Sequence, residues 1–276
     1  MASPSLNNPV RRETAKIYLG RNVFGVAAIL FGIFTMSWHP FNVLQQAQAL
    51  GSAPHREILI YLVAAIEIVA GLAIQWPKTA RIAAAALAIL FTLVTLSWIP
   101  GIVAKPNAFY TWGAVFYVFS KASGALIVYA MFAPGGSQWP FRLARFACIS
   151  FALCLISFAI EQLEFFAHTA ELVPKWIPLG QNFWAIATTI AFFLAAIALL
   201  SGRVALLASR LTTAMLIGFG VLIWVPVCFG NVHNLYNWSE NLDNLAIAAA
   251  AWIVADFLSQ SRSDNRSPAA SDTLPT

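Results

Sequence analysis

One apolar stretch, residues 145–168, carries polar side chains at steps of four and three residues. At about 100° per residue, that spacing places them on one face of a helix. The face ends in two carboxylates and an imidazole, which can exchange protons or bind cations. Such groups are costly in an apolar helix unless they face a protein interior or a wet cavity. The residues of this polar face are Ser150, Cys154, Ser157, Glu161, Glu164 and His168.

Other ionisable residues are expected at the same height. At 1.5 Å per residue, Glu161 lies about 24 Å from the end of its helix near Arg145. Asp243 lies about five residues inward from Trp238, at a comparable height. We therefore predict one polar pocket near the outer surface, in which neighbouring carboxylates share a proton or bind a cation. Its candidate residues are Glu161, Glu164, His168, Asp243, His39 and His233.

Two opposite charges are predicted deeper in the chain's apolar segments. Glu67 lies about 15 Å into its segment and Lys121 about 14 Å into another. Charges at one depth in neighbouring helices are natural partners. We predict an ion pair between them, and a proton or substrate relay is the alternative interpretation.

Motifs for several other chemistries are absent from the sequence. The spacing Glu-x-x-Glu-x-x-x-His differs from the Glu-x-x-His pair of di-iron bundles, so we predict no metal site. There is no Cys-x-x-Cys-His for haem, and the three cysteines form no Cys-x-x-Cys pair. No phosphate-binding glycine loop or zinc-protease motif occurs. These absences leave the cofactor unknown.

The composition is that of a membrane protein. Of 276 residues, 60% are hydrophobic and only 10% are charged, whereas about 25% are charged in soluble domains. Each apolar run is roughly the 20 residues that a membrane helix needs, so the expected environment is the lipid bilayer and not a nucleic acid. We predict eight spans, at about residues 18–38, 57–76, 79–99, 111–132, 145–166, 183–201, 204–224 and 239–258.

The positive charges are distributed unequally. Twelve of the 16 Lys and Arg residues fall on one side of the predicted membrane and three on the other. Because positive residues favour the cytoplasmic side, we predict a multi-pass inner (plasma) membrane protein with both termini in the cytoplasm. All four histidines would then lie at the outer face.

A sequence pattern recurs at an offset of 126 residues: Trp98-Ile-Pro is followed by Tyr110-Thr-Trp, and Trp224-Val-Pro by Tyr236-Asn-Trp. We therefore predict an all-α integral membrane fold of two tandem four-helix repeats. Four spans in each repeat give both the same, parallel orientation. The predicted parts are a cytoplasmic N-terminal segment (1–17), the repeats (18–132 and 145–258), a cytoplasmic linker (133–144) and a disordered cytoplasmic tail (259–276).

Several short motifs resemble the DoxX family and its DoxX-like relatives: Glu67-Ile-Val-Ala-Gly71 and Arg81-Ile-Ala-Ala in the first half, and Phe165-Phe-Ala-His168, Leu172-Val-Pro-Lys-Trp176 and Asn241-Leu-Asp-Asn-Leu245 in the second. The resemblance implies two fused four-helix membrane units. Some relatives are membrane subunits of quinone-linked sulfur oxidation or partners in oxidative-stress complexes, and the resemblance implies a role of this kind. The cysteine pair of the methylamine-utilisation relatives is missing here.

Three functions follow as hypotheses. The first is an accessory membrane subunit that partners a redox protein. The second is a quinone-interacting oxidoreductase subunit, in which Glu161, Glu164 and His168 accept protons beside the quinone headgroup. The third is a transporter of a small solute that uses the repeat and the Glu67–Lys121 pair. The sequence leaves open whether the protein is an enzyme.

Overall fold

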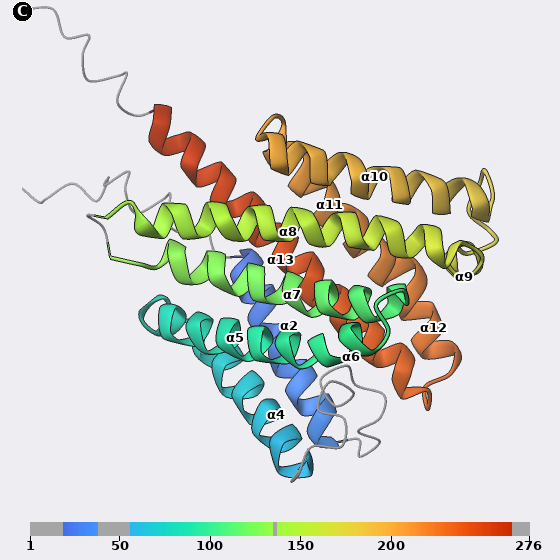
Figure 1. Ribbon diagram of the computed structural model, residues 1–276, viewed down its shortest axis with the longest axis horizontal. Coiled ribbons are helices and arrows are strands. Elements are labelled where there is room, and N and C mark those ends of the chain that lie inside the picture. The colour runs from blue at the N-terminus through green and yellow to red at the C-terminus, as the bar shows by residue number, and fades with distance from the viewer. Residues whose placement is uncertain (1–18, 38–55, 135–136, 267–276) are drawn as a thin grey trace, which may run out of the picture.

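The computed structural model describes residues 19–37, 56–134 and 137–266, and these residues form helices and connecting turns (Figure 1). Seven helices in the described residues are long and apolar enough to cross a membrane. Two of them are interrupted. The seven are α2 (Leu19–Ser37), α5 (Pro77–Ser97) continued by α6 (Ile99–Ala104), α7 (Phe109–Met131), α8 (Trp139–Glu164), α10 (Gln181–Ser201), α11 (Ala205–Phe219) continued by the π-helix η1 (Gly220–Trp224) and α12 (Val225–Gly230), and α13 (Leu235–Arg266).

The remaining predicted span corresponds to α4 (Arg56–Ala73), which packs against α2. It carries three charged residues among its 18, namely Arg56, Glu57 and Glu67, whereas each of the seven contains an 18-residue stretch with at most two. The structure thus gives an all-α protein with seven candidate membrane spans, and α4 as an eighth span stays a prediction.

Small residues allow α2 and α4 to approach closely. A Cβ atom added at Gly71 would lie 2.6 Å from the carbonyl oxygen of Gly25, and one added at Gly32 would lie 2.6 Å from that of Ala64. Such glycines let helix backbones touch, which is how many membrane helices associate. The α2–α4 pair lies at one edge of the bundle, and α10 and α11 lie at the opposite edge (Figure 1).

Helix α13 lies at the centre of the bundle. It contacts α2, α7, α8 and α11, and the side chains of residues 246–251 are buried. Five of these six residues are alanine, and small side chains allow several helices to pack around one. This central position brings the polar start of α13 next to α7.

The seventh predicted span, residues 204–224, is not a regular helix to its end. It begins as α11, widens into η1 and continues as α12, whose first turn contains Pro226. Proline lacks an amide hydrogen and clashes with the carbonyl four residues earlier, at Leu222. The wide π-turn accommodates that clash, and such turns are frequent at functional sites.

Three tryptophans near helix starts make the same local contact. The indole Nε1 atoms of Trp112, Trp184 and Trp238 each donate a hydrogen bond to the carbonyl six residues earlier, at 2.9, 2.7 and 3.1 Å. These bonds tie each helix to the turn before it. The arrangement of the two halves as a repeat stays a prediction.

Candidate functional site

A cavity of about 560 Å³ lies between α8, α10, α11–η1 and α13. The short helix α9 (Phe166–Leu172) and the turn after it complete one wall, and Tyr117 of α7 also lines the cavity. The volume is within the range of small-molecule sites, about 300–1,000 Å³. Apart from Tyr117, the described residues that line it belong to the second half of the chain.

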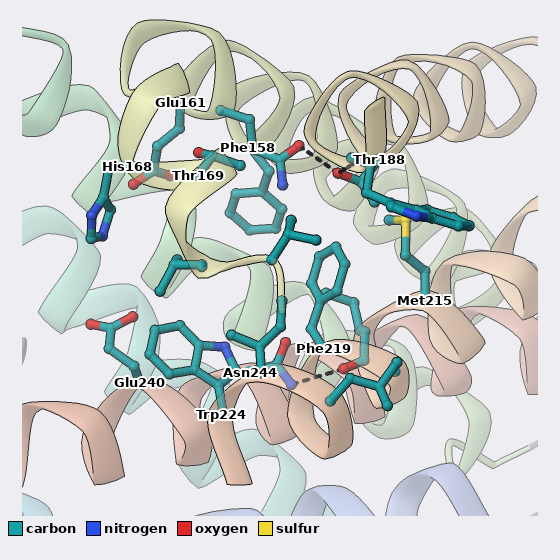
Figure 2. Close-up of a pocket in the computed structure, with 18 of the residues that line it drawn as sticks. Phe158, Glu161, His168, Thr169, Thr188, Met215, Phe219, Trp224, Glu240 and Asn244 are labelled. Atoms are coloured by element: carbon teal, nitrogen blue, oxygen red, sulfur yellow. Dashed lines mark hydrogen bonds between the residues drawn. The ribbon is translucent and has the colours of Figure 1, made fainter. Parts of the chain in front are cut away.

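The cavity has a polar side and an apolar side. Figure 2 shows Glu161, His168 and Glu240 on one side and Met215 and Phe219 on the other. Aromatic rings form a continuous wall through edge contacts, with centroids 5.8–6.3 Å apart. That wall runs through Tyr117, Phe158, Phe192 and Phe219.

Most hydrogen-bond donors of known geometry around the cavity are already used within the protein. The hydroxyl of Tyr117 donates to Oε2 of Glu240 at 3.3 Å. The amide of Asn244 donates to the carbonyl of Leu216 at 2.9 Å, just before the π-turn (Figure 2). On the opposite wall, the hydroxyls of Thr188 and Thr189 donate to Oε1 of Gln162 at 3.3 and 2.9 Å.

Glu161 is different from these residues. Its side chain is half-buried and lines the cavity, and it has no hydrogen bond or ion pair with any residue that the structure describes. Gly113 of α7 leaves room beside it, since a Cβ atom there would lie 3.8 Å from its carboxyl group. Both oxygens of Glu161 can therefore accept hydrogen bonds from a ligand.

A buried ion pair lies next to the cavity. The ammonium group of Lys121 on α7 bonds to Oδ1 of Asp243 on α13, and each residue is 1% exposed. The Lys121 ammonium also lies 5.1, 5.5 and 5.8 Å from the ring centroids of Phe31, Phe91 and Tyr117. Carboxylate and aromatic faces together stabilise the buried charge.

The structure thus gives Lys121 a different partner from the predicted Glu67. The prediction paired Glu67 with Lys121 because both are expected at the same depth in the membrane. Equal depth does not determine which helices are neighbours or which side chains face each other. The central helix α13 contacts α7 directly and supplies Asp243 instead. Glu67 is buried and lines a second, small cavity together with Lys121 and Phe24.

Two cross-links between α7 and α13 lie one helical turn apart. The first is the hydrogen bond from Tyr117 to Glu240, and the second joins Lys121 to Asp243. Lys121 follows Tyr117 by four residues on α7, and Asp243 follows Glu240 by three residues on α13. Glu240, Asp243 and Glu161 are near enough to interact electrostatically. Tyr117 connects the cavity with the ion pair, because it lines the cavity and its ring lies 5.8 Å from the Lys121 ammonium.

The predicted site residues are only partly brought together. Glu161 and His168 line the cavity, and Asp243 lies one turn beyond it in the ion pair. Glu164 and His233 are exposed and do not line the cavity, and His39 lies outside the described residues. In the described part of the chain, no group of three His, Cys, Asp or Glu residues could hold a metal ion.

Sequence reasoning missed Glu240, Tyr117 and Asn244. Glu240 could have been found, because it precedes Asp243 by three residues and so shares its helix face. Tyr117 precedes Lys121 by four residues in the same way. Asn244 could not have been found from the sequence, because its partner is the backbone carbonyl of Leu216 on another helix, close to the π-turn.

No protein-family model, curated protein or solved structure matches this chain. Its sequence and structure define a polytopic membrane protein, and the geometry of the cavity carries the functional argument.

Proposed function

We propose that this protein binds an amphipathic small molecule in the cavity of its second half. The observation that carries the proposal is a ligand-sized cavity with carboxylates on one side and aromatic and aliphatic side chains on the other. A concave, mostly apolar site with a few polar groups is the usual form of a ligand site. Because the surrounding helices are apolar enough for a membrane, the ligand would be one that partitions into lipid.

The proposed setting is an eight-span protein of the inner membrane, with α4 as the additional span. Glu67, the charge farthest from the ends of α4, is 1% exposed, which supports this assignment because buried charges avoid lipid. The excess of Lys and Arg on one side supports cytoplasmic termini. In that orientation the cavity lies near the extracytoplasmic face, as the position of Glu161 far from the Arg145 end of α8 implies.

A quinone is the second candidate ligand. The imidazole of His168 and the carboxyl group of Glu161 share the polar side, and such groups can exchange protons with a quinone headgroup. This candidate fits the resemblance to DoxX and the proposal of a membrane subunit that partners a redox protein. Transport of the bound molecule is a further proposal, supported by the charged residues Lys121, Asp243 and Glu67 inside the bundle.

Filling the cavity tests ligand binding directly. Gly218 lines the cavity, and a Cβ atom added there meets no other atom within 4 Å, so Gly218→Phe should occupy the cavity without disturbing the helix. Gly230→Phe is the matched control, because Gly230 also meets nothing within 4 Å and does not line the cavity. Native mass spectrometry of the protein extracted from membranes would compare co-purifying molecules.

We expect a bound small molecule in the wild type and in Gly230→Phe, and its loss in Gly218→Phe. A molecule that stays bound equally in Gly218→Phe would contradict the proposal. If nothing co-purifies, the proteins would be titrated with decylubiquinone and with lipophilic amines as probes. Weaker binding to Gly218→Phe than to Gly230→Phe would then support the proposal, and equal binding would contradict it.

A further inference from the structure

We propose that the headgroup of the ligand is a protonated amine, so that the cavity selects lipophilic organic cations. This inference rests on the proposed function, since it specifies the ligand class of the same cavity. Three observations support it: the sign of the charges around the cavity, the balance of hydrogen-bond donors and acceptors, and the aromatic wall.

The charges around the cavity are of one sign. Among the described residues that line it are the carboxylates of Glu161 and Glu240 and the imidazole of His168, but neither lysine nor arginine. The nearby ammonium of Lys121 is bonded to Asp243 and is surrounded by three aromatic rings. The Lys121 ammonium therefore neutralises Asp243 and not the two carboxylates that line the cavity. An ammonium group in the cavity would supply the missing positive charge and stabilise both carboxylates in their ionised form.

The hydrogen bonds point to a donor on the ligand. The hydroxyl of Tyr117, the amide of Asn244 and the indole of Trp184 donate to protein acceptors at 3.3, 2.9 and 2.7 Å. Acceptors remain in excess, since the Glu161 carboxyl group has no partner among the described residues, while Glu240 receives bonds from Tyr117 and Tyr236. A primary ammonium has three donors for these carboxylates. A quinone headgroup has only acceptors and would need donors from the protein, which in the described lining include the indole of Trp224 and the imidazole of His168.

The aromatic wall provides the third observation. The rings of Tyr117, Phe158, Phe192 and Phe219 follow each other by edge contacts along the cavity. Aromatic faces attract organic cations and also receive an apolar tail. Carboxylates on one side and rings along the wall therefore match an amine attached to an aromatic or aliphatic group.

A matched ligand series tests the charge. The full-length protein in lipid nanodiscs would be titrated calorimetrically with 4-phenylbutylammonium and with 4-phenylbutan-1-ol, after subtraction of binding to protein-free nanodiscs. The two probes share their tail and differ in the headgroup. Decylubiquinone is the third probe. We expect the ammonium to bind at least about tenfold more tightly than the alcohol, as expected for a charge-assisted hydrogen bond.

Three variants and one control locate the effect. Glu161→Gln and Glu240→Gln should each weaken ammonium binding by about tenfold or more and change alcohol binding less than about threefold. Glu171→Gln is the control, because Glu171 is an exposed carboxylate of α9 that does not line the cavity. Glu161→Asp keeps the charge and should weaken ammonium binding less than Glu161→Gln does.

The outcomes separate the two proposals. Equal binding of alcohol and ammonium, tighter binding of decylubiquinone, or unchanged ammonium binding in both Gln variants would overturn the cation inference and leave ligand binding intact. Binding of all probes that is unaffected by Gly218→Phe would overturn the proposed function itself. If a Gln variant does not fold, the comparison of ammonium with alcohol in the wild type decides.

Discussion

Breaking the Lys121–Asp243 pair should destabilise the protein strongly and asymmetrically. The two residues are 1% exposed, so neither charge can turn to water when its partner is removed. Removing one partner of a buried ion pair costs about 3–5 kcal/mol, because the other charge stays buried. The informative variants are Lys121→Met, Asp243→Asn and the double substitution.

The asymmetry follows from what each single variant leaves behind. Lys121→Met leaves Asp243 one turn from Glu240, with two carboxyl groups and no cation. Asp243→Asn leaves an ammonium that still faces three aromatic rings at 5.1–5.8 Å, and a desolvated cation–π contact is worth about 2 kcal/mol. We therefore expect Lys121→Met to cost more by about 1–2 kcal/mol, and the double variant to cost less than Lys121→Met alone.

The assay is unfolding by SDS in mixed micelles, followed by circular dichroism, with the free energy of unfolding compared among the variants. Lys175→Met is the control, because Lys175 is exposed and its loss should change stability by about 0.5 kcal/mol or less. Single variants within 1 kcal/mol of the wild type, or costs that simply add in the double variant, would refute the role of the pair.

Three further predictions concern the packing, the π-turn and the orientation. Gly25→Ala should destabilise the protein by about 1–3 kcal/mol, because its Cβ atom would lie 2.4 Å from Cγ2 of Ile74, just after α4, and 2.7 Å from the carbonyl oxygen of Gly71. Gly101→Ala, with its nearest neighbour at 4.0 Å, should be neutral, and equal effects in the same SDS assay would contradict this packing. Asn244→Ala should cost about 1–3 kcal/mol and speed amide hydrogen exchange around the π-turn, whereas unchanged exchange would argue against its bond at 2.9 Å. With the three buried native cysteines replaced by serine, Lys175→Cys should react with a membrane-impermeant maleimide from outside sealed cells and Arg142→Cys only after lysis, and the reverse pattern would refute the proposed orientation.

The helical class and the seven candidate spans could be predicted from the sequence, because apolar runs of membrane length are a strong signal. The position of the break inside the seventh span could not be predicted from the sequence. Pro226 lies beyond the predicted end of that span at residue 224, and the π-turn forms before it. A single proline signals a break but does not say how the preceding turn adjusts.

The candidate site was predictable along a helix but not across helices. The spacing of Glu161 and His168 on one face of a predicted continuous helix indicated a polar lining, and both residues line the cavity. The predicted helix 145–168 was wrong at its end, because it breaks at Phe165 and leaves Glu161 on α8 and His168 on the separate α9. Glu164 has the same spacing, yet it is exposed where α8 ends. Pairing across helices depends on which helix lies in the centre, so Lys121 was assigned to Glu67 although Asp243 on the central α13 is its partner.

Binding of the 4-phenylbutyl series to the wild type, Gly218→Phe and Gly230→Phe in nanodiscs tests whether the cavity is a ligand site. We expect one saturable site per chain in the wild type and in Gly230→Phe, and binding at least about tenfold weaker in Gly218→Phe, because the new ring occupies the cavity. Equal binding by all three proteins would show that the cavity between α8, α10, α11–η1 and α13 is not the ligand site.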